Sequence, residues 1–334
     1  MPTVSSDCFI DPVFVDQTEK HLARLTPFRG TSPEGFKTNF LGIQCDIEFI
    51  QMLNPKAYEL EKHAREIVTH HPRIESGELY FECGSLLAAI HESAEPRGFQ
   101  MVELGGGWGA RAVTAHAMLK QIKPHVREFY IVVEAMREHC GWIRKHMLDN
   151  GIDANRHSIV HAAIWVDNQP KLFPDCAGIL GQSVSYDAPD CVADLTPQEA
   201  KESLLNIVRT GELGIVDPFE SRGGRQSRKW SFVSTVTLRD ILLPIEQMDY
   251  IDIDIQGAEQ RVILDGIDLL EERVKRLHVG THGEEIHAKL TELFETRGWQ
   301  VLVQIPPHGE YSSEWGDFST SDGILSVVNR RLGQ

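Results

Sequence analysis

The distribution of apolar residues changes character near Gly98. After this point, short apolar runs alternate with longer segments whose apolar residues recur every three or four positions, the pattern of strands that alternate with helices. This order predicts an α/β fold with a mostly parallel sheet and right-handed crossovers. The predicted strands are 99–104, 129–134, 158–164, 233–238, 249–255 and 276–280, and the predicted helices are 110–121, 137–149, 238–243, 284–296 and a segment that starts at 258.

The ends of this pattern set the domain organisation. The runs 300–305 and 323–329 predict an antiparallel finish to the sheet. Residues 1–97 lack a strand rhythm, so we expect a helical cap or oligomerisation segment there and a ligand-binding domain over 98–334. The clearest helix of the cap is 55–70, where Ala57, Leu60, Ala64 and Ile67 could form an apolar stripe.

A long segment interrupts the alternation at about 167–234. A stretch of this length between sheet strands is more often a lid or an insertion than a plain connection. It contains one predicted helix, 197–208, and a polar run, 220–229, with the basic residues Arg222, Arg225, Arg228 and Lys229. This run could hold an anionic group, or it could be a solvated loop.

Glycines mark the first turn of the predicted sheet. The segment Glu103-Leu-Gly-Gly-Gly-Trp-Gly109 follows the strand 99–104 and leads directly into the helix 110–121. Backbone without Cβ atoms can approach a ligand closely there, and the free N–H groups of the helix end favour a polar or anionic group. We therefore expect a nucleotide-like ligand at Gly105, Gly106, Gly107 and Gly109.

Two kinds of ligand use such a turn. The dinucleotide pattern G-x-G-x-x-G/A can be placed on Gly105, Gly107 and Ala110, so a nicotinamide or flavin cofactor stays open. The acid Glu103 favours S-adenosylmethionine instead, because this ligand carries an ammonium and a sulfonium and no phosphate. A second acid, Glu134, ends the strand 129–134, where a carboxylate can bind both ribose hydroxyls of a nucleoside of either kind.

Acidic residues also alternate along the strand 249–255. A period of two places Tyr250, Asp252 and Asp254 on one side of the strand. The carboxylates of Asp252 and Asp254 therefore need a ligand, a cation or a hydrogen-bond donor. The next strand ends at His282, which should reach the same cleft as Asp254. A carboxylate with an imidazole predicts a general base or a metal site, although Asp254 could also serve only to cap the following helix.

Composition limits the classes of partner and compartment. The net charge of −16 disfavours nucleic acid and anionic membranes. No apolar stretch reaches the roughly 20 residues that span a bilayer, and the first residues lack the pattern of a signal peptide, so we expect a cytoplasmic protein. The six cysteines form no C-x-x-C pair, which favours reduced, structural thiols.

The chain resembles the FkbM-type S-adenosylmethionine-dependent methyltransferases over roughly residues 79–302. The resemblance is carried by Glu103-Leu-Gly-Gly-Gly-Trp-Gly109, Val132-Val-Glu134, Ala162-Ala-Ile164, Val236-Thr-Leu-Arg-Asp240 and above all Asp252-Ile-Asp-Ile-Gln-Gly-Ala-Glu259, which is similar to the family signature I-D-V-E-G-A-E. It implies the Rossmann-like class I methyltransferase sheet and methylation of a hydroxyl, often on sugars or polyketide-like metabolites. The chain departs from the pattern at Gln256, in its long insertion and in its first 90 residues.

The resemblance also implies roles for single residues. Glu103 and the glycines with Glu134 and Ala135 would hold the methionine and ribose portions of the donor, and Ala162 with Ala163 would border the adenine. Some related sugar O-methyltransferases bind a divalent metal at the ends of the fourth and fifth strands. Here Asp254, His282 and Asp252 would be the ligands, for magnesium or manganese, and one imidazole would also admit iron.

Together these observations predict an S-adenosylmethionine-dependent methyltransferase that acts on an oxygen of a small-molecule acceptor. Asp254 or His282 would take up the proton of the acceptor. Two alternatives remain open at this point: an NAD(P)-dependent oxidoreductase, and a catalytically silent protein that binds S-adenosylmethionine. A homo-oligomer is also compatible with the N-terminal segment.

Overall fold

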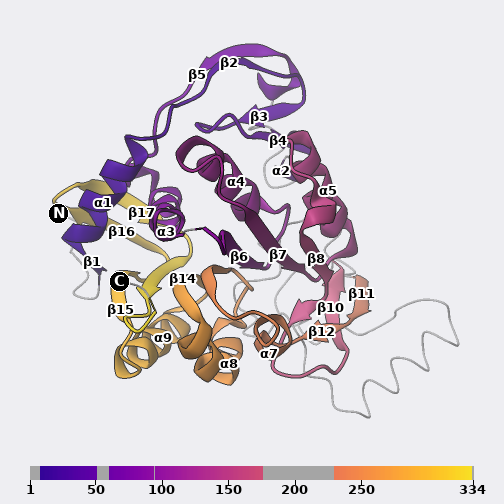
Figure 1. Cartoon of the computed structure of the whole chain (residues 1–334), viewed down its shortest axis with the longest axis vertical. Coiled ribbons are helices and arrows are strands. Elements are labelled where there is room, and N and C mark those ends of the chain that lie inside the picture. Colours follow the sequence, from indigo (N-terminus) through magenta and orange to yellow (C-terminus); the bar gives the residue numbers. More distant parts are fainter. Residues whose placement is uncertain (1–7, 51–59, 94, 176–228, 333–334) are drawn as a thin grey trace, which may run out of the picture.

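The computed structural model describes residues 8–50, 60–93, 95–175 and 229–332. Its centre is one eight-stranded sheet (Figure 1). The strands of this sheet are β1 (Phe9–Ile10), β6 (Phe99–Leu104), β7 (Glu128–Glu134), β8 (Ser158–His161), β13 (Met248–Ile253), β14 (Val274–Thr281), β15 (Gln300–Ile305) and β18 (Gly323–Val328).

The spatial order of the strands identifies the type of sheet. The order is β1-β15-β18-β14-β13-β6-β7-β8, and the strands from β14 to β8 are parallel. β18 lies between β14 and β15 and is antiparallel to both. This arrangement is the Rossmann-like sheet of class I methyltransferases with its antiparallel last strand, as the sequence predicts.

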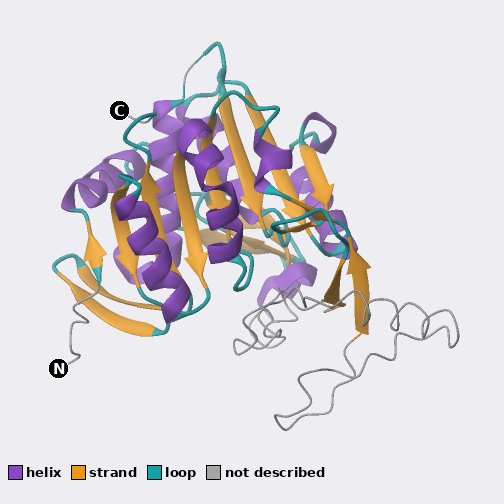
Figure 2. Cartoon of the chain, turned by 90° about the horizontal axis from the view of Figure 1, so that it is seen from below, coloured by secondary structure: helices purple, strands orange, loops and turns teal. Residues whose placement is uncertain are grey.

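Helices cover both faces of the sheet (Figure 2). One core cluster combines the sheet with α1, α3, α4 and α5, and a second combines it with α7, α8 and α9. None of the helices in the described part of the chain has the length and apolar character needed to cross a membrane. The bounds are α1 Pro12–Leu22, α2 Ile47–Ile50, α3 Glu78–Glu92, α4 Ala110–Ile122, α5 Arg137–Asp149, α7 Leu238–Leu242, α8 Glu259–Arg273 and α9 Glu284–Thr296.

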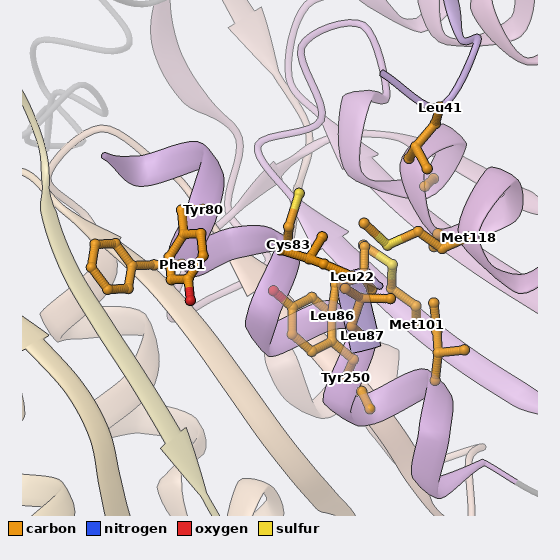
Figure 3. Close-up of a cluster of buried hydrophobic side chains, with 14 of the residues drawn as sticks. Leu22, Leu41, Tyr80, Phe81, Cys83, Leu86, Leu87, Met101, Met118 and Tyr250 are labelled. Atoms are coloured by element: carbon orange, nitrogen blue, oxygen red, sulfur yellow. The ribbon is translucent and has the colours of Figure 1, made fainter. Parts of the chain in front are cut away.

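The alternation of side chains along each strand produces these two clusters. Met101 and Tyr250 point to the face that α3 covers, whereas Val102 and Ile251 point to the other face. Figure 3 shows Met101 and Tyr250 in contact with the side of α3 that carries Leu86. The inner strands are therefore buried on both faces, which is typical of a parallel sheet.

The N-terminal segment is helical only in part. Besides α1, α2 and α3, residues 8–97 contain the strand pairs β2 (Arg29–Ser32) with β5 (Arg65–Val68) and β3 (Phe36–Thr38) with β4 (Gln44–Asp46), and the short 3-10 helices Leu60–Lys62 and Ile74–Ser76. The predicted helix 55–70 is absent over residues 60–70, and its first part, with Ala57, lies outside the described residues. Leu60 of the supposed apolar stripe is 67% exposed, so no core faces it.

Two parts of this N-terminal segment contact the central sheet directly. β1 pairs with β15, and α3 packs against β13, β14 and β18. A role of residues 1–97 in oligomerisation stays a prediction.

The insertion begins and ends in a short antiparallel pair. β10 (Lys171–Asp175) pairs with β11 (Lys229–Val233), and next to it β9 (Ala163–Ile164) pairs in parallel with β12 (Thr235–Val236). The predicted helix 197–208 and the basic run, except Lys229 in β11, lie outside the described residues. A second hairpin, β16 (Gly309–Ser313) with β17 (Gly316–Thr320), lies between β15 and β18 and was not predicted.

Candidate functional site

The glycine-rich turn joins the end of β6 to the start of α4. Gly105, Gly107 and Gly109 have φ of 82°, 53° and 73°, which is the left-handed region that favours glycine. The N–H groups of Gly105 and Gly106 both donate to the carbonyl of Val133 at 3.0 Å, which fixes the turn against β7. A Cβ on Gly105 would overlap the backbone oxygen of Asp254, so the turns after β6 and β13 approach each other through backbone alone.

The carboxylate of Glu103 caps helix α4. It is buried, and its two oxygens accept the N–H groups of Arg111 at 3.1 Å and Ala112 at 3.0 Å. Burial raises the pKa of Glu103 to about 7. The expectation of free N–H groups at this helix end is therefore corrected, because an acid of the protein itself already accepts two of them.

Glu134 lies directly beside the same turn. It is 6% exposed, and its oxygens accept the N–H groups of Gly107 at 2.8 Å and Met136 at 2.7 Å. Each carboxylate oxygen has two lone pairs, so one acceptor position on each remains for hydroxyl groups of a ligand. The structure thus places the carboxylate of Glu134, at the end of β7, in hydrogen-bonding contact with Gly107 of the glycine turn.

The residues expected at the adenine also lie next to Glu134. The N–H of Ala162 donates to the carbonyl of Glu134 at 3.0 Å, and Ala163 follows in β9. Ala162 and Ala163 are buried, whereas Ala135 is partly exposed. Ala162 and Ala163 therefore lie beside the end of β7, with their side chains buried.

Asp254 and His282 meet at the ends of two neighbouring strands. Asp254 follows β13 and His282 follows β14, and these strands pair in parallel. Asp254 Oδ1 lies 3.5 Å from His282 Nε2, and the side chain of Asp254 is 45% exposed while that of His282 is 6% exposed. The structure therefore brings the two side chains together, and Asp254 is the one that a ligand can reach.

His282 is surrounded by carboxylates. Its Nδ1 lies 2.9 Å from Oε1 of Glu259, which is completely buried and also accepts the N–H groups of Ile255 and Gly257. Its Nε2 lies 3.6 Å from Asp322 Oδ1. Burial opposes the charged imidazole, but the hydrogen bond to Glu259 and the charges of Glu259, Asp254 and Asp322 outweigh it and raise the pKa of His282 to about 9.

This charge state separates the two predicted proton acceptors. An imidazole with a pKa of about 9 already carries its second proton at neutral pH, so it cannot take up another. Asp254 keeps an exposed carboxylate that receives a hydrogen bond of 2.9 Å from the side chain of Gln256. Of the pair, Asp254 is thus the group suited to accept a proton.

Asp252 belongs to a different set of contacts. Its side chain is buried and accepts a hydrogen bond of 3.3 Å from the Tyr250 hydroxyl. Its Oδ2 lies 3.8 Å from Nε of Arg111. Burial raises the pKa of Asp252 to about 7. Among the described residues no group of three or more His, Cys, Asp or Glu side chains is arranged to hold a metal ion, so the expected metal site of Asp252, Asp254 and His282 is not formed.

Three residues of this region were not assigned a role from sequence. Glu259 ends the Asp252–Glu259 motif, so its position was visible but its contact with His282 was not. Asp322 stands in a Ser-Asp-Gly turn before the last strand, where no pattern distinguishes it. His139 has Nδ1 at 3.5 Å from Glu134 Oε1 and stacks on Trp142, with ring centroids 4.6 Å apart.

No family model matches the chain. A protein of Jannaschia sp. (strain CCS1) named "Putative methyltransferase" is 23% identical over 281 residues, which are 83% of this chain and 86% of that protein. In sequence, therefore, the chain is similar to a protein named as a methyltransferase.

Solved structures of methyltransferases are also similar to the chain. Methyltransferase FkbM from Methylobacillus flagellatus KT is 12% identical, with a TM-score of 0.38, over 74% of this chain and 54% of its own. The C-terminal domain of precorrin-6Y C5,15-methyltransferase from Rhodobacter capsulatus is 13% identical, with a TM-score of 0.37, over 76% of this chain and 92% of its own.

Proposed function

We propose that the protein transfers a methyl group from S-adenosylmethionine to a hydroxyl of a small-molecule acceptor. One observation carries the choice of cofactor. The backbone N–H groups that would receive a pyrophosphate at the glycine turn are accepted by Glu103 and Glu134 instead. A dinucleotide would bring its phosphates against two carboxylates, whereas a ligand that is net positive gains from them.

The residues present fit this donor. Glu134 retains acceptor positions for both ribose hydroxyls, Gly105 and Gly107 allow close approach of the methionine portion, and the small side chains of Ala162 and Ala163 would border the adenine. The donor supplies an electrophilic methyl carbon, whose bond to sulfur breaks with the electron pair left on sulfur as the acceptor oxygen bonds to carbon. The protein has to align the acceptor and remove its proton.

Asp254 is the group that would take up this proton. Its carboxylate lies at the carboxyl edge of the sheet, near the glycine turn, and is open to solvent. His282 lies behind it, with Nε2 3.5 Å from Oδ1 of Asp254. Asp254→Asn should therefore lower turnover strongly while donor affinity stays within a few fold, and Asp265→Asn, on the surface of α8, is the control.

Two other functions make different predictions. An NAD(P)-dependent oxidoreductase would be stabilised against heat by a nicotinamide dinucleotide, because a ligand that binds only the folded state raises the melting temperature. A silent donor-binding protein would be stabilised by S-adenosylmethionine but would label no acceptor. We expect stabilisation by S-adenosylmethionine and by its demethylated product, and no effect of NAD or NADP.

Calorimetry with Glu134 variants tests the donor site itself. Glu134→Ala should weaken donor binding by about 1.5–3 kcal/mol, the range for hydrogen bonds to a charged group. The same variant removes the acceptor of two backbone N–H groups, so Glu134→Gln, which retains one acceptor oxygen, accompanies it. Glu138→Ala, on the exposed first turn of α5, is the control, and unchanged donor affinity in both Glu134 variants would exclude the ribose contact.

A further inference from the structure

A polar pocket of about 390 Å³ opens where the start of α3, the start of α4 and the end of β17 meet. Glu78 and Glu82 contribute carboxylates, Arg111 contributes a guanidinium, and Ser319 and Ser321 contribute hydroxyls, while Leu79 supplies apolar surface. None of these residues was assigned a role from the sequence. The pocket is large enough for a molecule of the size of a small metabolite and offers it mainly hydrogen-bonding groups.

The pocket lies next to the proposed site of methyl transfer. Arg111 stands in the first turn of α4, directly after the glycine turn. On the opposite wall, Glu78 Oε1 accepts the N–H groups of Ser321 at 2.9 Å and Asp322 at 3.0 Å. Since Asp322 faces His282, this wall is continuous with the Asp254 and His282 pair.

The order of the strands places the pocket away from the nucleoside end of the donor. Glu134 ends β7, on one side of β6, whereas β13, β14 and β18, against which α3 packs, lie on the other side. A donor whose ribose is bound at Glu134 therefore extends toward β6 and β13. The space beyond, at the start of α3, is left for a second molecule.

We infer that this pocket binds the methyl acceptor and that the acceptor is a small polyhydroxylated molecule without an anionic group. The inference rests on the methyl transfer proposed above. Hydroxyl groups can donate to Glu78 and Glu82 and accept from Arg111 and the serine hydroxyls. An apolar acceptor would displace water from these groups without replacing its hydrogen bonds, which is costly.

The charges around the pocket disfavour an anionic acceptor. The one guanidinium of the wall, on Arg111, is already paired with Glu82 and lies 3.8 Å from Asp252. Burial, followed by the repulsion of neighbouring carboxylates, raises the pKa of both Glu82 and Asp252 to about 7 despite that guanidinium. A phosphate or carboxylate in the pocket would add repulsion to groups that already resist ionisation.

The test uses the full chain, methyl-labelled S-adenosylmethionine and a small-molecule extract of the source organism. Labelled products are separated by anion exchange and by reversed-phase chromatography. We expect the label in a product that neither column retains. Ser319→Phe, which narrows the pocket, should reduce labelling by about tenfold or more, equivalent to about 1.4 kcal/mol. Ser312→Phe, on the paired strand β16 and outside the pocket, should not reduce it.

Donor affinity, measured by calorimetry, distinguishes the ways in which the inference can fail. Ser319→Phe should leave the affinity for S-adenosylmethionine unchanged, and an equal loss of donor affinity would show that the pocket belongs to the donor. A labelled product that binds the anion exchanger or the reversed-phase column would overturn the acceptor class. Donor binding with no labelled product at all would overturn the proposed function and, with it, the acceptor pocket.

Discussion

At the scale of single residues, the carboxylates of Glu103 and Glu134 accept backbone N–H groups that an anionic ligand would otherwise bind at the glycine turn. The sequence located both Glu103 and Glu134, because each ends a strand beside glycines. It could not show that their partners are backbone N–H groups, since these contacts depend on the left-handed conformation of Gly107 and on the first turn of α4. Charge alone suggested a cationic ligand, and the observed hydrogen bonds give that preference a structural basis.

Replacement of Glu103 by Gln separates its two effects. The amide keeps one acceptor oxygen for α4 but loses the charge that Glu103 carries above its pKa of about 7, so above that pH the free energy of unfolding should fall by about 1 kcal/mol, as for a weakened helix cap. S-adenosylmethionine should lose more affinity than its demethylated product, which lacks the sulfonium. Denaturant unfolding and calorimetry measure the two effects, and equal losses for both ligands would contradict the electrostatic part.

The charge on His282 should appear in the pH dependence of stability. Its pKa of about 9 in the folded protein exceeds the value of 6.5 for a free imidazole, so the folded state binds the proton more tightly. The resulting stabilisation is complete below pH 6.5 and is lost as the pH rises through 9. His282→Gln should lack this loss, because Glu259, Asp254 and Asp322 then face a neutral group. Identical curves for both proteins between pH 6.5 and 9.5 would refute the assignment.

Much of this site could be predicted because strand ends are visible in the sequence. Asp254 and His282 each follow an apolar run, and parallel neighbours end at the same edge. The choice between them as proton acceptor needed the structure, since it depends on Glu259 and Asp322, which come from a helix start and a distant turn. The family resemblance implied a metal ligand at Asp252, but in the structure its carboxylate lies 3.8 Å from Nε of Arg111.

At the scale of elements, prediction succeeded where a segment buries a whole face. α5, α9, β6 and β15 have the predicted bounds because their apolar period is long and faces the core. The strands β2 to β5 are three or four residues long and only partly buried, so they leave no such period. The Ile67-Val68-Thr69 run, rich in β-branched residues, was the available sign of a strand there.

Replacement of two glycines by alanine should change the stability of the protein in opposite directions. Gly105→Ala adds a Cβ that meets the backbone of Asp254 at a positive φ, so it should lower the melting temperature and donor affinity together. Gly141→Ala lies within α5 with no atom within 4 Å of the added Cβ, so it should stabilise the protein by about 0.5–1 kcal/mol. Thermal unfolding of the two variants measures these effects. A stabilised Gly105→Ala protein would disprove the close approach of the turns that follow β6 and β13.

At the scale of the whole molecule, the sheet gathers residues from distant parts of the chain at one edge. Glu82 comes from α3, Arg111 from α4, Asp254 from the end of β13 and Asp322 from the turn before β18. Because β14 and β18 pair side by side, the last part of the chain lies next to residues that precede it by 42 positions (Thr281 and Gly323) to 52 positions (Arg276 and Val328). For this reason, no single sequence motif contains the residues of the proposed acceptor pocket.

The pairing of β10 with β11 has a consequence for how such a protein can change in evolution. Asp175 and Lys229 stand opposite each other, so the chain leaves and re-enters the described structure at one point. The entropy of closing a loop between two such positions depends only weakly on its length, by about 0.6 kcal/mol for each doubling. Since an Asn-Gly turn can join two antiparallel strands, replacing residues 176–228 by Asn-Gly should keep β10 paired with β11, so chain of different lengths can be inserted at this point without separating the two strands.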